Sequence, residues 1–178
     1  TTKRAVMAAA LLHDLGHGPY SHLFELVSAK HHEEYSVDII NDPATDIYKA
    51  FEKHEPGARE QVVQILEGTH PIHWCNQVIS SEVDMDRLDY LLRDSQSTGA
   101  AYGQIDWRWL IKNARIIDDK LVFKEKALTV IESLLLGRYH MNIAVYWNPK
   151  NVANQITYKG WFRRMRYLKK NGLLKGTY

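Results

Sequence analysis

LLHDLGHGPYSH, residues 11–22, begins as an apolar helix and then gathers three histidines and one aspartate around two glycines and a proline. Burying an unpaired neutral polar group costs roughly 2–7 kcal/mol, and burying an unpaired charge costs more. A chain keeps such a cluster beside its core when the groups are hydrogen-bonded to one another or bind a ligand. The stretch therefore predicts a functional site at the end of the first helix.

The composition is that of one globular domain. The chain has 178 residues, of which 45% are hydrophobic and 25% charged, and a formal net charge of +2, which is ordinary for a globular domain. No apolar run reaches the roughly eighteen residues of a membrane span, and nothing resembles a secretory signal. We expect a cytoplasmic or otherwise intracellular protein, and the single cysteine, Cys75, fits a reducing compartment.

The sequence starts at Thr1, without methionine, and enters a helical pattern immediately. We therefore expect residues 1–178 to be a single domain fragment of a longer protein. An N-terminal part and further C-terminal parts would lie outside it.

Helix-forming residues dominate most of the chain. The apolar spacing and the positions of glycines and prolines predict helices over residues 6–15, 20–29, 31–40, 58–68, 78–98, 126–146 and 151–170. Two β-branched runs within 115–123, on either side of Asp118 and Asp119, predict a hairpin. The expected fold class is all-α, a helical bundle with at most one small β-hairpin near 115–123.

The helix expected over 78–98 carries an unusual polar face. Asp86, Tyr90 and Asp94 recur at i, i+4 and i+8, and Arg87 lies beside them. Residues at this spacing project from one side of a helix. Because a tyrosine is unusual among charges on a solvated face, the stripe is interpreted as a binding surface.

The alternative for this stripe is a solvated face with ion pairs along it. The neighbouring pair Asp89 and Arg93, at i and i+4, is interpreted in that way. We expect this pair to be exposed and without a functional role.

His13 and Asp14 are candidate metal ligands. An imidazole with a carboxylate suits Mn²⁺, Fe²⁺, Zn²⁺ or Mg²⁺, and the lack of thiolates argues against a structural zinc site. Two residues do not make a site, but His17 and His22 follow closely and bring three imidazoles near one helix end. The alternative is that His17 and His22 only cap local backbone groups.

Together, these residues resemble a known family. HDLGHGPYSH at 13–22, the His32-Glu33 step and DMDRLDYLLRDS at 84–95 are similar to the HD-domain phosphohydrolases, and most closely to the branch of deoxynucleoside triphosphate triphosphohydrolases and their bacterial relatives. The resemblance runs from residue 5 to residue 146. The HD pair alone is a weak signal, whereas the full first string followed by D-x-D-K/R-x-D-Y-x-x-R-D is specific.

The resemblance implies one divalent metal ion, Mn, Mg, Fe or Zn, held by a histidine, the His-Asp pair and a distant aspartate. The ligands carried over are His13, Asp14 and Asp86. The first histidine of the family pattern would fall before Thr1, so this chain would lack one ligand.

The resemblance also implies a set of catalytic residues. His17 would contact the α-phosphate, and His22 would be the general acid toward the leaving oxygen. Glu25 would orient His22 at a position where relatives often have Asp. His32 would lie near the attacking water, with His31 as a competing candidate.

Five further residues match positions that bind substrate in the family. Arg87 and Arg138 correspond to cations that bind phosphate. Tyr90 corresponds to a tyrosine that packs on the deoxyribose, and Tyr146 to a tyrosine near the sugar. Asp94 corresponds to a carboxylate that binds the sugar 3′-hydroxyl.

One position departs from the pattern. Asn148 stands where close relatives tend to carry His, which leaves the base preference open. The basic segment 159–170 is compatible with phosphate contacts, but it does not indicate nucleic acid as a partner.

The expected function is metal-dependent hydrolysis of a deoxynucleoside triphosphate to deoxynucleoside and triphosphate. One alternative keeps the metal and the histidines but uses another phosphate ester, such as a nucleoside monophosphate or a cyclic nucleotide. Another is a nucleotide sensor or interaction module without turnover. By resemblance the protein would be a homo-oligomer, a dimer or tetramer, that binds a deoxynucleotide and has no membrane partner.

Overall fold

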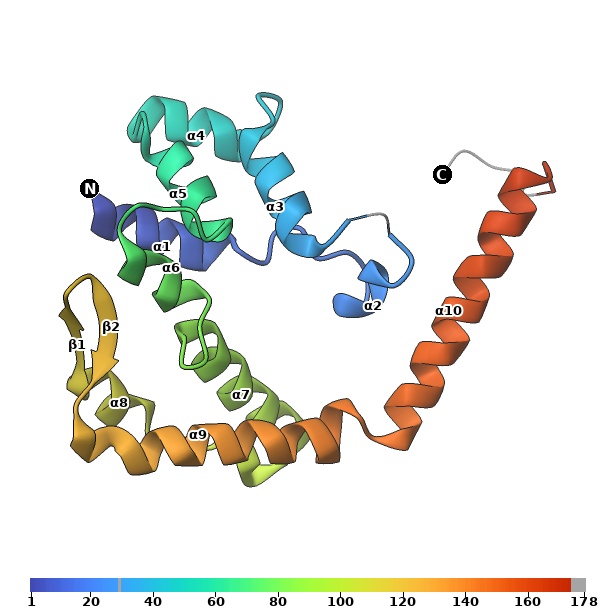
Figure 1. Cartoon of the computed structure of the whole chain (residues 1–178). Helices are drawn as coiled ribbons and strands as arrows, with labels where there is room; N and C mark the ends of the chain where they lie inside the picture. The colour runs from blue at the N-terminus through green and yellow to red at the C-terminus, as the bar shows by residue number, and fades with distance from the viewer. Residues whose placement is uncertain (29, 174–178) are drawn as a thin grey trace.

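The computed structural model describes residues 1–28 and 30–173, which are almost entirely helical (Figure 1). The α-helices of this part are α1 (Thr2–Leu12), α2 (His22–Glu25), α3 (His32–Asn41), α4 (Asp46–His54), α5 (Ala58–Leu66), α6 (His73–Ile79), α7 (Met85–Thr98), α8 (Trp107–Asn113), α9 (Leu128–Met141) and α10 (Pro149–Lys170). Short 3₁₀ turns lie at Ala101–Gly103 and Glu125–Ala127, and a π-helical turn, η3 (Asn142–Tyr146), follows α9. No helix described in the structure is both long and apolar enough to cross a membrane. The predicted all-α fold class is confirmed.

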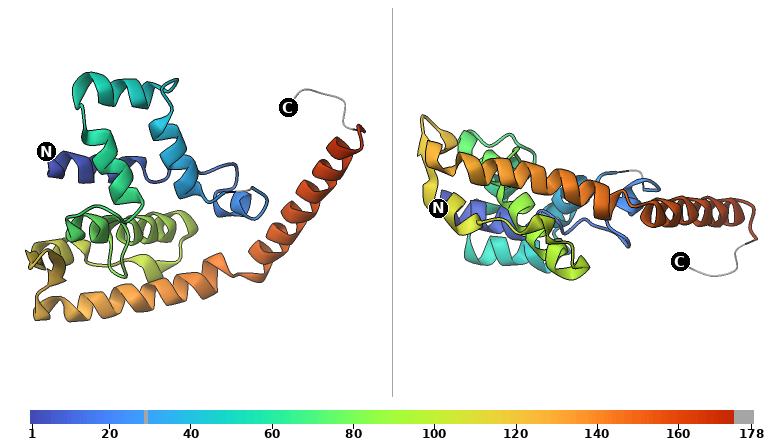
Figure 2. Two further views of the ribbon diagram at one scale, coloured as in Figure 1. Left: turned by 45° about the horizontal axis from the view of Figure 1, so that its top comes forward. Right: turned by 90° about the horizontal axis from the view of Figure 1, so that it is seen from below.

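The helices bury two hydrophobic clusters. The first joins α1, α3, α5 and α6 through buried residues that include Ala9, Ile40, Val62, Ile65 and Cys75. The second joins α7, α8 and α9 through Leu88, Leu91, Leu110, Leu134 and Met141, among others. Figure 1 shows the corresponding two groups of helices, and Figure 2 shows that α9 and α10 follow one another as a long bent rod whose second half projects beyond the rest.

The end of α1 is held against the start of α3. α1 gives way to a turn after Leu12, and a Cβ added to Gly16 would lie 2.0 Å from the carbonyl oxygen of His32 and 2.5 Å from the amide nitrogen of Ser36. Real Cβ atoms do not approach other atoms so closely, so the contact requires glycine. This contact brings the His13-Asp14 pair and His32 to the same place.

The predicted hairpin is confirmed. β1 (Ala114–Ile117) pairs antiparallel with β2 (Lys120–Phe123), with Ile117 opposite Lys120. The two turn residues, Asp118 and Asp119, have φ values of 48° and 59°. Two consecutive residues in this left-handed region match the type I′ turn that suits the twist of a hairpin, and Asp is among the residues that tolerate it.

Two predicted helices differ in extent. The pattern over 78–98 spans two helices, because α6 ends at Ile79 and the Asp84 side chain caps α7 by accepting a hydrogen bond from the Arg87 amide (2.8 Å). The helix predicted over 20–29 is reduced to the single turn α2, since Tyr20 and Ser21 have φ values of 69° and 54°. Residue 29 lies outside the described residues.

Three helices of the described residues lie wholly or almost wholly outside the predicted ranges: α4, α6 and α8. Each has nine residues or fewer. Segments this short show only two turns of periodicity, and their helical state depends on packing against neighbours rather than on local preference. The remaining predicted helices, over 6–15, 31–40, 58–68, 126–146 and 151–170, correspond to α1, α3, α5, α9 with η3, and α10.

Ser36 links α3 to the end of α1. Its buried hydroxyl donates to the His13 carbonyl oxygen (2.7 Å) and accepts from the Gly16 amide (2.8 Å). Ser36→Ala is expected to lower the free energy of unfolding by about 2 kcal/mol, because two backbone groups lose their partner. Urea denaturation measures this. Ser133→Ala, which removes an exposed hydroxyl on α9, should change stability much less, and equal losses in the two variants would contradict the argument.

Candidate active site

One cavity of about 820 Å³ lies between the end of α1, α7 and the junction of α9 with α10. It is lined by eleven of the twelve predicted site residues: His13, Asp14, His17, His22, His32, Asp86, Arg87, Tyr90, Asp94, Arg138 and Tyr146. The twelfth, Glu25, is not a lining residue but accepts hydrogen bonds from the lining residues His22 and His32. The two halves of the predicted site, residues 13–32 and 86–146, are more than 50 residues apart in the sequence and therefore meet only through the fold.

The first group in the cavity is His13, Asp14 and Asp86. His13 Nδ1–H donates to the Ala10 carbonyl oxygen (2.8 Å), and Nε2 lies 3.2 Å from Asp14 Oδ1 and 3.2 Å from Asp86 Oδ1. The hydrogen bond to Asp86, with smaller contributions that include the Ala10 carbonyl, raises the pKa of His13 to about 9 despite partial burial. The same hydrogen bond lowers the pKa of Asp86.

This group suits a divalent metal ion. One donor atom from each of the three residues lies within 4.8 Å of the others. A histidine binds a metal only in its neutral form. In that form of His13 the Ala10 carbonyl holds the remaining proton on Nδ1, and the lone pair of Nε2 faces the two carboxylates. An imidazole and two carboxylates are typical ligands for Mn²⁺, Fe²⁺, Zn²⁺ or Mg²⁺.

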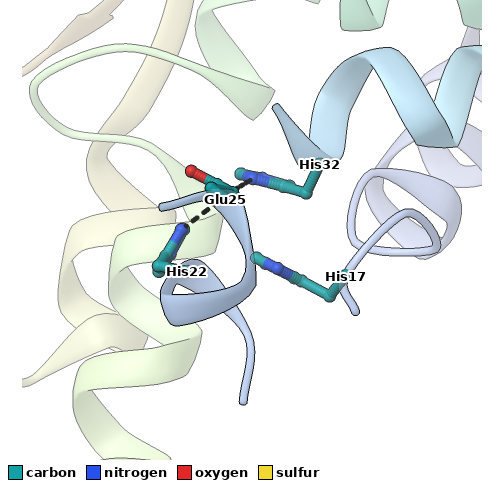
Figure 3. Close-up of side chains that lie close together, drawn as sticks. All are labelled: His17, His22, Glu25 and His32. Atoms are coloured by element: carbon teal, nitrogen blue, oxygen red, sulfur yellow. Dashed lines mark hydrogen bonds and ion pairs between the residues drawn. The ribbon is translucent and has the colours of Figure 1, made fainter. Parts of the chain in front are cut away.

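The second group is His17, His22, Glu25 and His32, shown in Figure 3. His17 and His32 stack with ring centroids 3.9 Å apart, and the His22 ring meets both of them edge-on at 4.8 and 5.1 Å. Burial, followed by the neighbouring His32, lowers the pKa of His17. Asp14 joins the two groups, because its Oδ1 lies 3.4 Å from His17 Nε2 and 3.9 Å from His32 Nε2.

Glu25 orients three imidazoles. It accepts hydrogen bonds from Nδ1 of His32, of His22 (3.1 Å) and of His31 (3.4 Å). This leaves Nε2 of His22 and of His32 available for other partners. Of the two candidates for one position, His32 lines the cavity and His31 does not.

The Glu25 contacts also predict a pH-dependent stability. Burial alone would raise the pKa of Glu25, but the hydrogen bonds from His32, His22 and His31 outweigh it and lower the pKa from 4.5 to about 2. A carboxylate with a depressed pKa stabilises the fold above pH 4.5, and this contribution is lost as the pH falls toward 2. Glu25→Gln should therefore be less stable than wild type by on the order of 2 kcal/mol at pH 6, with the difference shrinking below pH 4.5.

Urea denaturation of both proteins between pH 6 and pH 3 measures this difference. Glu67→Gln, an exposed position after α5, is the matched control and should show no such trend. A Glu25→Gln deficit that stays constant down to pH 3 would show that the carboxylate charge is not responsible.

The stripe on α7 extends the cavity away from the histidines. Tyr146, in η3, donates its hydroxyl to Asp94 Oδ2 (2.7 Å), and its ring lies 6.4 Å from that of Tyr90. Burial and the bond to Asp94 raise the pKa of Tyr146, and burial raises the pKa of Tyr90. Both phenols are therefore neutral at physiological pH and present an aromatic face and a polar edge to the cavity.

Two arginines supply positive charge to the cavity. Arg87 donates to Asp84 and to the Ser81 carbonyl oxygen, and Arg138 of α9 lies 3.5 Å from the exposed Glu82. Asp84, buried at 1% exposure, was not assigned a role from the sequence. Asp is a preferred N-cap residue, but the helical pattern over 78–98 placed Asp84 inside a helix rather than at the start of one.

Several cavity residues were not predicted. Four of them, Asn142, Trp147, Val152 and Gln155, come from the junction of α9 with α10, and four others, Leu66, Ile79, Ser80 and Asp84, come from the end of α5 and from the chain between the end of α6 and α7. Asn148 is not among the lining residues, since its side chain accepts a hydrogen bond from the Lys150 amide (3.0 Å) as the N-cap of α10. As predicted, Asp89 and Arg93 form an exposed ion pair (2.6 Å) outside the cavity.

Family models match most of the chain. The model described as the HD domain matches residues 2–94, more than half of the sequence, and includes every residue of the two groups above. The chain belongs to the HD-domain family. A second model, described as an HD associated region, matches residues 105–159 and covers the α8–α9 part and the first half of α10.

Individual relatives agree with this assignment. The chain is 35% identical to an uncharacterized protein of Bacillus subtilis, over 93% of this chain and 38% of that protein. It is 31% identical to the deoxynucleoside triphosphate triphosphohydrolase SAMHD1 homolog of Dictyostelium discoideum, over 81% of this chain and 30% of that protein. A crystal structure described as a phosphohydrolase from Bacteroides thetaiotaomicron superposes with a TM-score of 0.84 at 34% identity, covering 99% of this chain and 42% of that one.

The aligned regions cover most of this chain but less than half of each relative. This HD domain spans 30–42% of the length of the three relatives, so each of them contains a large additional part. The family and the fold are shared across the aligned region. What the whole protein does is a separate question.

Proposed function

We propose that this HD domain is a metal-dependent phosphohydrolase whose substrate is a deoxynucleoside triphosphate, cleaved to deoxynucleoside and triphosphate. The observation that carries the proposal is the arrangement of three groups of residues in one cavity. The possible metal ligands and the cluster of imidazoles meet at Asp14. The part of the cavity away from the histidines has the phenols of Tyr90 and Tyr146 and the carboxylate of Asp94. The metal ligands and the imidazoles suit hydrolysis of a phosphate ester. The two phenols and the carboxylate suit binding of a sugar.

His13, Asp14 and Asp86 would hold the divalent ion. When bound, such an ion lowers the pKa of water and neutralises charge on phosphoryl oxygens. His17 and His32 stack beside Asp14, where an α-phosphate and the attacking water would lie next to the ion site. Their Nε2 atoms would contact the phosphate and position the water.

His22 would be the general acid. Water attacks the α-phosphorus, the bond from phosphorus to the 5′ oxygen breaks, and the leaving oxygen needs a proton to depart as a hydroxyl. Glu25 accepts from Nδ1 of His22, so the proton to be transferred would sit on Nε2. Histidine is the side chain suited to donate a proton near neutral pH.

The α7 stripe would bind the nucleoside. The Asp94 carboxylate has capacity to accept a hydrogen bond from a sugar 3′-hydroxyl besides that from Tyr146, while Tyr90 would pack against the sugar ring. Arg87 and Arg138 would meet the phosphate chain, and their charge would stabilise the transition state. The names of two relatives support the class of reaction, since one is a deoxynucleoside triphosphate triphosphohydrolase homolog and one a phosphohydrolase.

The direct test is product analysis. The full-length protein is incubated with each of the four dNTPs and Mn²⁺ or Mg²⁺ in water enriched in ¹⁸O, and products are separated by ion-exchange chromatography. The proposal predicts deoxynucleoside and intact triphosphate, with the ¹⁸O in triphosphate because water adds to phosphorus. Nucleotide binding without turnover would indicate a sensor, and the absence of binding would redirect the search to other phosphate esters.

A further inference from the structure

The segment that carries His22 has little structure of its own. α2 is a single helical turn with no buried residue, and it follows two residues in the left-handed region, Tyr20 and Ser21. One turn of helix is unstable in isolation, because nucleation costs more than one hydrogen bond returns. Contacts from elsewhere in the chain must therefore hold this segment at the cavity.

α10 supplies such contacts from about 139 positions further along the chain. The Tyr158 hydroxyl donates to the Pro19 carbonyl oxygen (3.3 Å), and its ring packs on Tyr20 at 4.9 Å. Phe162 meets Phe24 edge-on, with ring centroids 6.1 Å apart. Arg166 donates to the Val27 carbonyl oxygen.

The three α10 residues form one stripe. Tyr158, Phe162 and Arg166 are spaced i, i+4 and i+8, which places them on a single face of the helix. They contact the beginning, the middle and the end of the 19–27 segment, in that order. Because these contacts cover the whole segment, α10 supports α2 along its length rather than at one point. Figures 1 and 2 show α10 passing beside α2.

α2 is held from two sides. On one side Glu25 accepts hydrogen bonds from His32 and His31 at the start of α3. On the other side Phe24 is enclosed between Phe162 and Gly18, where an added Cβ would lie 2.3 Å from the Phe24 ring. Because Glu25 and Phe24 are adjacent, a shift of Phe24 would carry Glu25 and His22 with it.

We propose that Tyr158, Phe162 and Arg166 are positioning residues for His22: they hold α2 so that the proton donor reaches the leaving oxygen. This inference rests on the proposed function of His22. Small misplacements of an acid relative to the reacting atoms lower the rate of the chemical step much more than they weaken substrate binding. None of the three residues lines the catalytic cavity.

The activity test uses Phe162→Ala in the full-length protein, with Ile156→Ala on an exposed face of the same helix as the matched control. For dNTP hydrolysis, Phe162→Ala should lower kcat by about 10- to 100-fold with KM changed less than about twofold. Phe162→Leu, which retains an apolar side chain, should recover part of the rate. The Ile156→Ala control should behave as wild type.

A substrate that needs no proton donor separates positioning from general damage. 4-Nitrophenolate leaves without protonation, so Phe162→Ala should hydrolyse bis(4-nitrophenyl) phosphate at close to the wild-type rate. An equal loss with both substrates would overturn the positioning role. Arg166→Met, which removes only the donor to Val27, provides a second variant if Phe162→Ala does not fold.

Hydrogen exchange tests the contact without reference to activity. Amides of residues 20–27 should exchange faster in Phe162→Ala than in wild type or Ile156→Ala, because α2 opens locally. Unchanged exchange, or faster exchange with unchanged dNTP turnover, would refute the inference. A wild-type protein that does not hydrolyse dNTPs would refute the proposed function instead, and the exchange data would still decide whether α10 holds α2.

Discussion

Asp86→Ala is expected to abolish tight binding of Mn²⁺ and to lower dNTP hydrolysis by on the order of 10³-fold or more, since a catalytic metal contributes several kcal/mol to transition-state stabilisation. Asp86 Oδ1 lies 3.2 Å from His13 Nε2 and is the part of the ion site that α7 supplies. Its removal leaves His13 and Asp14, which are adjacent in the sequence, as the remaining ligands of this group. Isothermal titration with Mn²⁺, followed by the product assay, measures both effects.

The matched control is Asp89→Ala on the same helix. Asp89 pairs with Arg93, is 62% exposed and lies outside the cavity. We expect its loss to change metal affinity and turnover by less than about twofold, because exposed ion pairs contribute little. If Asp86→Ala bound Mn²⁺ as wild type does, the ion site would have to lie elsewhere.

His22→Ala is expected to lower kcat for dNTP hydrolysis by about 10²- to 10⁴-fold, the range for loss of a general acid. Mn²⁺ binding at His13, Asp14 and Asp86 should stay at the wild-type level, since His22 belongs to the second group of possible metal ligands, with His17, Glu25 and His32. Hydrolysis of bis(4-nitrophenyl) phosphate should be largely retained, because its leaving group needs no proton. The comparison of the two substrates by steady-state kinetics isolates the proton transfer.

His31→Ala is an unusually close control for His22→Ala. Both imidazoles donate to Glu25, at 3.4 and 3.1 Å, and their side chains are 73% and 71% exposed. Only His22 lines the cavity. The proposal requires His31→Ala to keep most of its activity, and a loss equal to that of His22→Ala would show that the effect comes from the support of Glu25 rather than from proton donation.

Local sequence patterns predicted those parts of the fold that have strong periodicity or clear end signals. α3, α5 and α10 lie close to the expected ranges, and the hairpin turns at Asp118 and Asp119 as expected. The pattern over 78–98 was wrong at its start, because apolar periodicity continues from α6 into α7 and does not reveal that the chain changes direction at Ser80–Asp84. The short helices α4, α6 and α8 were missed because packing stabilises them.

The structure brings the expected site residues together most fully where one motif carries several of them. The 13–22 stretch and the α7 stripe with Arg87 supplied eight of the twelve expected residues, and all eight line one cavity. The supporting residues Asp84 and Ser36 were missed. Asp84 caps α7 and accepts a hydrogen bond from the Arg87 side chain. Ser36 bridges the His13 carbonyl and the Gly16 amide. Such supporting roles depend on the partner, which local sequence does not specify.

The sequence by itself determined the helical class, the hairpin, the chemistry of the two groups and the family resemblance, because these depend on residue type and on spacing within one element. The family resemblance led us to expect Asp86 beside His13, whereas only the tertiary structure decided that Tyr146 donates to Asp94 and that α10 supports α2. The residues of each pair lie more than 50 positions apart. Their contact depends on how the two hydrophobic clusters bring the helices together, and no local pattern encodes that geometry.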